Sequence, residues 1–312
     1  MLTNNFNKTK IAIIGAGAVG ATSAYVATLK NLASEIILID VNESKEAGEV
    51  MDIDDGLCFV GTGCIKGADF EDARDADIIV ITAGLAQKPD ETRLDLVKKN
   101  SIILKSILKS IGKLKPTAIL LLITNPVDIL TYLAQEWSGL PKNQVFGSGT
   151  GLDTARLRTD LGYLLEVSPK NIDGYVMGEH GDSGFVAWST VTIGGIPINN
   201  IKTANKKILA KLETKIKKEA YEIINRKGAT FYGISLVVSD IIEAILLNQH
   251  RIMPITSRIT NYNGINNICI GAPAVIGRKG VEKIWPVQLN TEEKKKLKKS
   301  ANILKGYLKE VL

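Results

Sequence analysis

Near its N-terminus the chain reads Ile11-Ala-Ile-Ile-Gly15-Ala-Gly17-Ala-Val-Gly20. The four apolar residues predict a buried strand. The Gly-x-Gly-x-x-Gly spacing after them is typical of the strand–turn–helix unit that binds a dinucleotide. In that unit Gly15 permits the tight turn, Gly17 lets the backbone approach a pyrophosphate, and Gly20 lets the helix pack on the strand. The helix N-terminus offers free N–H groups and a positive dipole to the phosphates. Three glycines alone are a weak signal, because a Gly-rich turn can also bind nothing.

The acid that ends the next predicted strand makes the motif more specific. Asp40 follows Glu35–Ile39 and lies 40 − 20 = 20 residues after Gly20. A carboxylate at this place accepts hydrogen bonds from the adenosine ribose and repels a 2′-phosphate. The sequence therefore predicts NAD, rather than NADP, as the cofactor.

Outward from this motif, short apolar runs alternate with helical patterns through the first half of the chain. Alternating strands and helices predict a parallel sheet with crossover helices, and wholly apolar strands predict helices on both faces. We expect strands at Ile11–Ile14, Glu35–Ile39, Asp77–Thr82, Thr117–Ile123 and Gln144–Gly147, and helices that include Val19–Lys30 and Arg93–Leu114.

The pattern changes after about Gly147. We expect a helix at Asp153–Glu166, short strands at Gly174–Met177 and Phe185–Thr192, a lysine-rich helix at Ile201–Arg226, a β region at Met253–Trp285 and a closing helix at Thr291–Leu312. The sequence thus predicts an α/β protein. Residues 1–147 would form a Rossmann dinucleotide-binding domain with a parallel sheet, and residues 148–312 an α+β substrate domain.

Composition narrows the class of protein. The chain has 312 residues, 45% hydrophobic and 23% charged, which is ordinary for a soluble globular protein. No apolar run is long enough for a membrane span, and the polar N-terminus lacks a secretory pattern. The three cysteines have no metal-ligand spacing, so we expect no metal site and a cytoplasmic location. The net charge of +6 favours anionic partners. The lysines, however, follow helix faces without interleaved aromatics, so we expect no nucleic-acid binding.

Two polar segments of the second half are candidates for chemistry. Gly178-Glu-His180-Gly-Asp182 places one of the two histidines of the chain directly after a predicted strand. Hydride transfer at an alcohol carbon needs a group that takes the hydroxyl proton, and imidazole titrates in the useful range. Asp153 and Arg156 share one helix face, where the acid can orient an imidazole and the guanidinium can grip a carboxylate. A turn histidine that only forms hydrogen bonds and a surface ion pair are the alternatives.

A third polar segment follows the predicted strand Asp77–Thr82. It runs from Ala83 through Gln87 to Arg93, at the carboxyl edge of the sheet, where ligands bind. Such a loop can close over a substrate and exclude water, and Arg93 can polarise a carbonyl. A solvated, charge-rich connection is the alternative for this segment.

Together these segments resemble the lactate/malate dehydrogenase family, and within it the bacterial members that act on L-lactate. The resemblance runs from about Lys10 to the C-terminus. It rests on Gly15/Gly17/Gly20 with Asp40, Gln87-Lys-Pro with Arg93, Thr124-Asn125-Pro126, Leu152-Asp-Thr-Ala-Arg156, and Gly178-Glu-His-Gly-Asp182. Five motifs in the same order are far more specific than one.

The resemblance implies a role for each matching residue. His180 would exchange the proton, Asp153 would orient it, Arg156 would bind the substrate carboxylate, and Arg93 would polarise the carbonyl. Asn125 would place nicotinamide and substrate, and Thr230 would line the substrate pocket. The cofactor would contact Gly15, Gly17, Val19, Gly20, Asp40, Ala83, Gly84, Thr124 and Asn125.

Position 87 bears on the substrate. Malate-specific relatives typically carry arginine there, matched to a second carboxylate, whereas this chain has the neutral Gln87. A buried dicarboxylate would lack a charge partner, so we expect lactate and pyruvate as the substrate pair. Malate dehydrogenase or another L-2-hydroxy acid dehydrogenase is the alternative within the family. An NAD- and metal-dependent glycosidase and a non-catalytic NAD-binding protein are alternatives from other classes.

One departure bears on regulation. Many bacterial relatives are activated by fructose 1,6-bisphosphate, which an arginine and a histidine bind between subunits. Arg158 matches the arginine, but Asp173 stands where the histidine is expected. A carboxylate repels phosphate, so we expect weak or absent activation. The family also implies a homotetramer.

Overall fold

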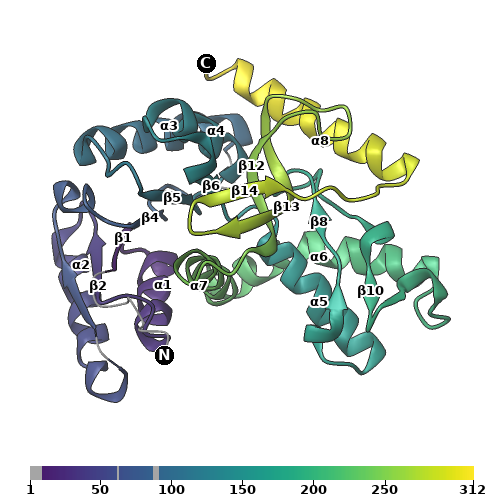
Figure 1. Cartoon of the computed structure of the whole chain (residues 1–312), viewed down its shortest axis with the longest axis horizontal. Coiled ribbons are helices and arrows are strands. Elements are labelled where there is room, and N and C mark those ends of the chain that lie inside the picture. The colour runs from purple at the N-terminus through teal and green to yellow at the C-terminus, as the bar shows by residue number, and fades with distance from the viewer. Residues whose placement is uncertain (1–8, 62, 87–90) are drawn as a thin grey trace.

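The computed structural model describes residues 9–61, 63–86 and 91–312, and a mixed sheet runs through the molecule (Figure 1). Within these ranges its strand order is β14-β13-β12-β6-β5-β4-β1-β2-β3. Strands β1 to β6 pair in parallel, whereas β12 to β14 pair antiparallel. The bounds are β1 Lys10–Ile14, β2 Glu35–Ile39, β3 Cys64–Gly67, β4 Ile78–Ile81, β5 Ile119–Leu122, β6 Val145–Gly147, β12 Arg251–Ile259, β13 Ile268–Gly277 and β14 Gly280–Ile284.

Helices cover the sheet, and two small sheets lie in the C-terminal half. The α-helices are α1 Ala18–Leu29, α2 Glu43–Asp54, α3 Arg93–Ile111, α4 Val127–Trp137, α5 Gly151–Leu165, α6 Lys206–Lys227, α7 Tyr232–Leu246 and α8 Thr291–Lys309. The small sheets combine β7 Ile172–Asp173 with β10 Thr192–Ile193 and β11 Ile196–Pro197, and β8 Val176–Met177 with β9 Phe185–Val186. Short 3-10 helices lie at Leu57–Phe59, Phe70–Ala73, Lys142–Gln144, Pro169–Asn171, Trp188–Thr190 and Ile198–Asn200.

The parallel strands separate two hydrophobic cores because successive side chains point to opposite faces. Ile14, Ile81 and Leu122 lie in the core that contains side chains of α3 and α4. Their neighbours Val80 and Leu121 lie in the core that contains side chains of α1 and α7. Figure 1 shows α3 and α4 on one side of these strands and α1 and α7 on the other. The expected doubly covered parallel sheet is therefore confirmed.

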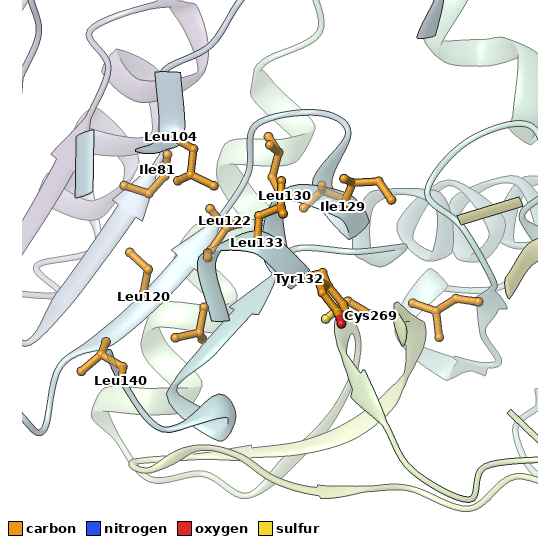
Figure 2. Close-up of a cluster of buried hydrophobic side chains, with 14 of the residues drawn as sticks. Ile81, Leu104, Leu120, Leu122, Ile129, Leu130, Tyr132, Leu133, Leu140 and Cys269 are labelled. Carbon is orange, nitrogen blue, oxygen red and sulfur yellow. The ribbon is translucent and has the colours of Figure 1, made fainter. Parts of the chain in front are cut away.

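Helix α4 links the two halves of the chain. Ile129, Leu130 and Leu133 are fully buried. They share a core with Leu122 of β5 and with Cys269 of β13, as Figure 2 shows. This packing fixes the N-terminus of α4 at the carboxyl end of β5, where the polar residues described below begin.

The second half of the chain differs in several places from the strands and helices expected from sequence. Its β region does not stand apart but extends the main sheet through one pairing, Thr256 with Gly147, so the sheet as a whole is mixed. The run expected as one strand at Phe185–Thr192 is broken by a 3-10 helix at Trp188–Thr190. Helix α6 begins five residues later than expected, because the Asn205 side chain caps it by accepting from Lys207 and Ile208 N–H.

Several elements of the described structure lie outside the segments expected from sequence, among them β3, β7, β11 and α7. Within the described ranges, no helix combines the length and apolarity needed to cross a bilayer.

Candidate active site

A groove of about 570 Å³ lies at the carboxyl end of β1, β2 and β4. Its lining includes Gly15, Gly17 and Asp40, together with Ala83 and Gly84. Its remaining wall includes the apolar side chains of Ile14, Ile39, Val41, Phe70, Leu85, Ile103 and Ile107. An apolar groove with a few polar groups at the carboxyl edge of a parallel sheet is where a nucleotide binds in this architecture.

Two of the three glycines are required by the turn itself. Gly15 has φ +109°, and a Cβ there would lie 2.6 Å from the Ala83 nitrogen. A Cβ on Gly20 would lie 1.7 Å from the Gly15 carbonyl oxygen, so helix α1 packs against the turn only with glycine there. At Gly17 a Cβ would meet no described atom within 4 Å, and this open side is where a pyrophosphate would need space.

The N-terminus of α1 and the Asp40 carboxylate complete the cofactor side. Gly17 is the N-cap of α1 and has no side-chain cap, so the N–H groups of the first turn, which includes Val19, stay available to an anion. Asp40 accepts hydrogen bonds from the N–H of Ala16 at 2.6 Å and of Asn42 at 2.9 Å. The acid thus fixes the glycine turn while its remaining lone pairs stay open to ribose hydroxyls.

The next part of the site is the loop after β5, which carries Thr124 and Asn125. The Thr124 hydroxyl donates to the Ala83 carbonyl at 2.8 Å. Asn100 of α3 donates to the carbonyls of Leu85 at 3.1 Å and Asn125 at 2.7 Å, and it accepts from the Leu85 N–H at 2.8 Å. Asn100 therefore joins the groove to the exposed Asn125.

Asn100 was not among the sequence candidates. A signal was nevertheless present, because a polar Asn100 interrupts the apolar stripe of α3 between Val97 and Leu104.

His180, Asp153 and Arg156 form a connected chain of contacts. The His180 Nδ1 lies 2.7 Å from Asp153 Oδ2, and Asp153 Oδ1 lies 3.2 Å from Arg156 Nη1. Arg156 is 7% exposed, and its Nε lies 3.5 Å from Glu219 Oε1 of α6. His180 directs its Nδ1 toward the acid, so its Nε2 is the ring nitrogen left to meet a substrate.

The charges around His180 favour its protonated form. Burial lowers the pKa of the imidazole, but the Asp153 carboxylate and its hydrogen bond raise it by more. The Asp128 carboxylate raises it further. The pKa of His180 is therefore raised above its usual value. Burial also acts to raise the pKa of Asp153, but the His180 and Arg156 charges outweigh it, so that pKa is lowered and the acid stays ionised.

Arg93 lies at the first residue of α3, beside His180. Its Nη2 lies 2.7 Å from Oε1 of the buried Glu179 and donates to the His180 carbonyl at 3.1 Å. The structure thus brings the guanidinium predicted to polarise a carbonyl next to the histidine. Glu179, its partner, was not a sequence candidate. Gln87, expected to set substrate choice, lies outside the described residues.

The other expected residues lie in neighbouring segments. Thr230 is partly exposed in the connection between α6 and α7. Arg158 and Asp173 both influence Tyr175, whose pKa is raised because burial outweighs the opposing charge of Arg158, and Asp173 adds to the effect of burial.

Across the described part of the chain, no group of three or more His, Cys, Asp or Glu side chains is arranged to hold a metal ion. The arrangement instead combines a nucleotide groove, a histidine–aspartate pair and two arginines. That set can move a proton and hold a carboxylate beside a hydride donor.

Known proteins share both halves of this architecture. The lactate/malate dehydrogenase NAD-binding domain model matches residues 9–147, and the alpha/beta C-terminal domain model of the same family matches residues 150–312. The chain is 46% identical to an L-lactate dehydrogenase of Clostridium botulinum, with 97% of this chain and 96% of that protein covered. It is 44% identical to an L-lactate dehydrogenase of a Thermoanaerobacter species, with 97% and 99% covered.

Solved structures agree with these relatives. The crystal structure of a minor L-lactate dehydrogenase from Enterococcus mundtii superposes with a TM-score of 0.94 at 38% identity, covering 98% of this chain and 99% of that one. Since both domain models and close full-length relatives match, the chain belongs to the lactate/malate dehydrogenase family.

Proposed function

We propose that this enzyme is an NAD-dependent L-lactate dehydrogenase that interconverts lactate and pyruvate. The observation that supports it most directly is the contact chain from His180 through Asp153 to Arg156. Asn100 links the nucleotide groove to Asn125. Asp128, three residues after Asn125, accepts a hydrogen bond from the His180 N–H. The full-length relatives named above carry the same activity in their names.

The residues of the groove fit NAD. The open side of Gly17, the uncapped N-terminus of α1 and the Asp40 carboxylate would hold the pyrophosphate and the adenosine ribose. Thr124 and Asn125, with Ala83 and Gly84, would hold the nicotinamide end. When bound, NAD supplies the group that accepts a hydride from lactate or, once reduced, donates one to pyruvate.

In the proposed mechanism Arg156 binds the substrate carboxylate through two parallel hydrogen bonds. In lactate oxidation neutral His180 takes the hydroxyl proton at Nε2, and ionised Asp153 stabilises the imidazolium that forms. In pyruvate reduction the protonated ring returns that proton to the substrate oxygen. Arg93 leaves its contact with Glu179 and stabilises the charge that develops on this oxygen.

The experiment that tests this function compares pyruvate with oxaloacetate as substrates for NADH oxidation. Because Gln87 offers no positive charge to a second carboxylate, we expect kcat/KM for pyruvate to exceed that for oxaloacetate by roughly 10²-fold or more. Preference for oxaloacetate would contradict the substrate assignment and leave the hydride chemistry in place.

Gln87→Arg is the matched variant for this assay. It supplies the missing charge partner, so we expect kcat/KM for oxaloacetate to rise by about 10²-fold and that for pyruvate to fall. A variant that gains nothing with oxaloacetate would show that position 87 does not face the substrate side chain.

Cofactor choice gives a second prediction. Asp40→Asn keeps an oxygen for the Ala16 N–H but removes the charge that repels a 2′-phosphate. Lys45 is the one cationic side chain among the described residues that line the groove, so it could then attract a 2′-phosphate. We expect kcat/KM for NADPH to rise about tenfold, with a smaller loss for NADH. Adding Lys45→Met should reverse most of the NADPH gain, and steady-state kinetics with both cofactors would measure it.

The pH dependence of the two directions is a third prediction. The raised pKa of His180 keeps the ring protonated to higher pH than an ordinary histidine. Pyruvate reduction, which uses the protonated ring, should hold at low pH and fall as pH rises through this pKa. Lactate oxidation should rise over the same interval. Initial rates at saturating cofactor measure both, and parallel pH profiles for the two directions would exclude His180 as the proton carrier.

We further infer that the enzyme forms a homotetramer and that it is located in the cytoplasm. Because Asp173 stands where relatives activated by fructose 1,6-bisphosphate carry a histidine, we expect this compound to have little effect when it is added to the pyruvate assay. Clear activation at low micromolar concentration would contradict this inference.

A further inference from the structure

The carboxylate of Asp128 is buried beside the proposed catalytic histidine, and no step above uses it. It is 1% exposed and lies in the first turn of α4, three residues after Asn125. Its Oδ2 accepts a hydrogen bond from the backbone N–H of His180 at 2.8 Å, and its Oδ1 accepts from the Thr256 hydroxyl of β12. Three elements distant in sequence therefore meet at this one side chain.

Neither hydrogen-bond partner needs a negative charge. An N–H and a hydroxyl would be satisfied by a neutral amide, whereas a buried carboxylate carries a large desolvation cost. Burial indeed raises the pKa of Asp128 to about 6. Hydrogen bonding alone therefore does not explain why this buried position holds an acid and not a neutral amide.

The neighbouring charges supply that reason. His180 favours the ionised form of Asp128, and Asp128 in turn favours the protonated form of His180. The other charged groups around the pair are Asp153 and Arg156 of α5, Arg93 of α3 and Glu179 beside the histidine. Among these groups, Arg156 lowers the pKa of His180, whereas Asp128 raises it, as Asp153 does. The two carboxylates therefore act in the same direction on the imidazole.

We propose that Asp128 is a positioning residue for the hydride transfer. Its carboxylate anchors the backbone of His180 and, as a second negative charge, stabilises the imidazolium that pyruvate reduction uses. Asp153 forms a hydrogen bond with the imidazole ring of His180, and Asp128 accepts one from the backbone N–H of the same residue. The inference rests on the proposed role of His180, and it assigns to α4 a function besides packing.

Asp128→Asn separates charge from geometry. The amide oxygen can accept from the His180 N–H while the amide nitrogen donates to Thr256, so the anchor stays and the charge goes. We expect the titration midpoint of His180 to fall by about one pH unit. Above both midpoints kcat/KM for pyruvate should then fall about tenfold. At acid pH it should match the parent enzyme, because Asp128 itself becomes protonated there.

The His180 midpoint can be read directly by NMR. The chain has only two histidines, so ¹³C-labelled imidazole gives two signals, and His250→Gln assigns them. Glu136→Gln is the matched control, because it removes an acid from the far end of the same helix, where Glu136 pairs with Arg258. It should leave the His180 midpoint and the rate profile unchanged.

Two results with Asp128→Asn would overturn the proposal: an unchanged His180 midpoint, or a loss of rate that is equal at every pH. Asp128→Ala removes the anchor as well and should lower kcat at acid pH too. If its profile equals that of Asp128→Asn, the anchoring half is wrong. If the alanine variant does not fold, the asparagine variant still decides. Failure of the parent enzyme to reduce pyruvate would refute the proposed function, while the NMR titration would still test the charge coupling.

Discussion

Replacing His180 with asparagine is expected to lower kcat for pyruvate reduction by roughly 10³- to 10⁴-fold, the contribution of a well-placed proton carrier. Asparagine can still form a hydrogen bond with Asp153, so the local structure should persist, but its amide does not titrate in the working range. The nucleotide groove lies on other segments, so NADH affinity, measured by fluorescence titration, should change little.

His250→Gln is the control for this experiment. His250 is half-exposed and pairs with Glu282 in the C-terminal β region, outside the contact chain of His180, Asp153 and Arg156. Its replacement should leave both kcat and NADH binding unchanged. Activity of the His180 variant within tenfold of the parent enzyme would place the proton carrier elsewhere. Loss of NADH binding would instead indicate a damaged fold.

The cofactor side of the site could be predicted from sequence because its determinants are local. Gly15 and Gly20 are fixed by contacts with residues of the same strand–turn–helix unit and with the adjoining β4 end. Asp40 follows the next strand, which pairs with β1 in register. A local steric rule and a short strand crossover are therefore enough to place these residues.

The residues that hold the backbone of His180 and its neighbour Arg93 in place could not be predicted in the same way. Asp128 lies 52 residues from it in sequence, and Glu179 gains its role only because Arg93, 86 residues earlier, folds against it. One signal did exist, because Asp128 is the single charged residue in the mostly apolar helical run from Val127 to Ala134. An acid in such a run predicts burial with a partner, but not which partner.

The mixed sheet illustrates the same limit. Strand β12 has the apolar content of a buried strand, yet its attachment to the first sheet rests on Thr256 pairing with Gly147, across more than a hundred residues. Glycine at 147 is required there because a Cβ would lie 2.6 Å from the Thr131 hydroxyl of α4. Long-range packing of this kind, and not the strand's own pattern, decides which sheet it joins.

Arg156→Lys is the second substitution with a large expected effect. The lysine keeps the positive charge beside Asp153 but loses the planar fork that binds a carboxylate through two parallel bonds. We expect kcat/KM for pyruvate to fall on the order of 10³-fold, most of it through a higher KM. Steady-state kinetics over a wide range of pyruvate concentration would measure both constants.

Arg226→Lys serves as the matched control, because Arg226 pairs with Glu222 on the exposed face of α6 and should tolerate the change. Thermal unfolding of both variants separates lost binding from lost stability, since Arg156 is buried and contacts Asp153 and Glu219. The pH profile gives the sharper test. A lysine that still carries the charge should leave the His180 midpoint near its parent value. A large shift would mean that Arg156 acts mainly on the histidine, and an unchanged KM would show that the substrate carboxylate binds elsewhere.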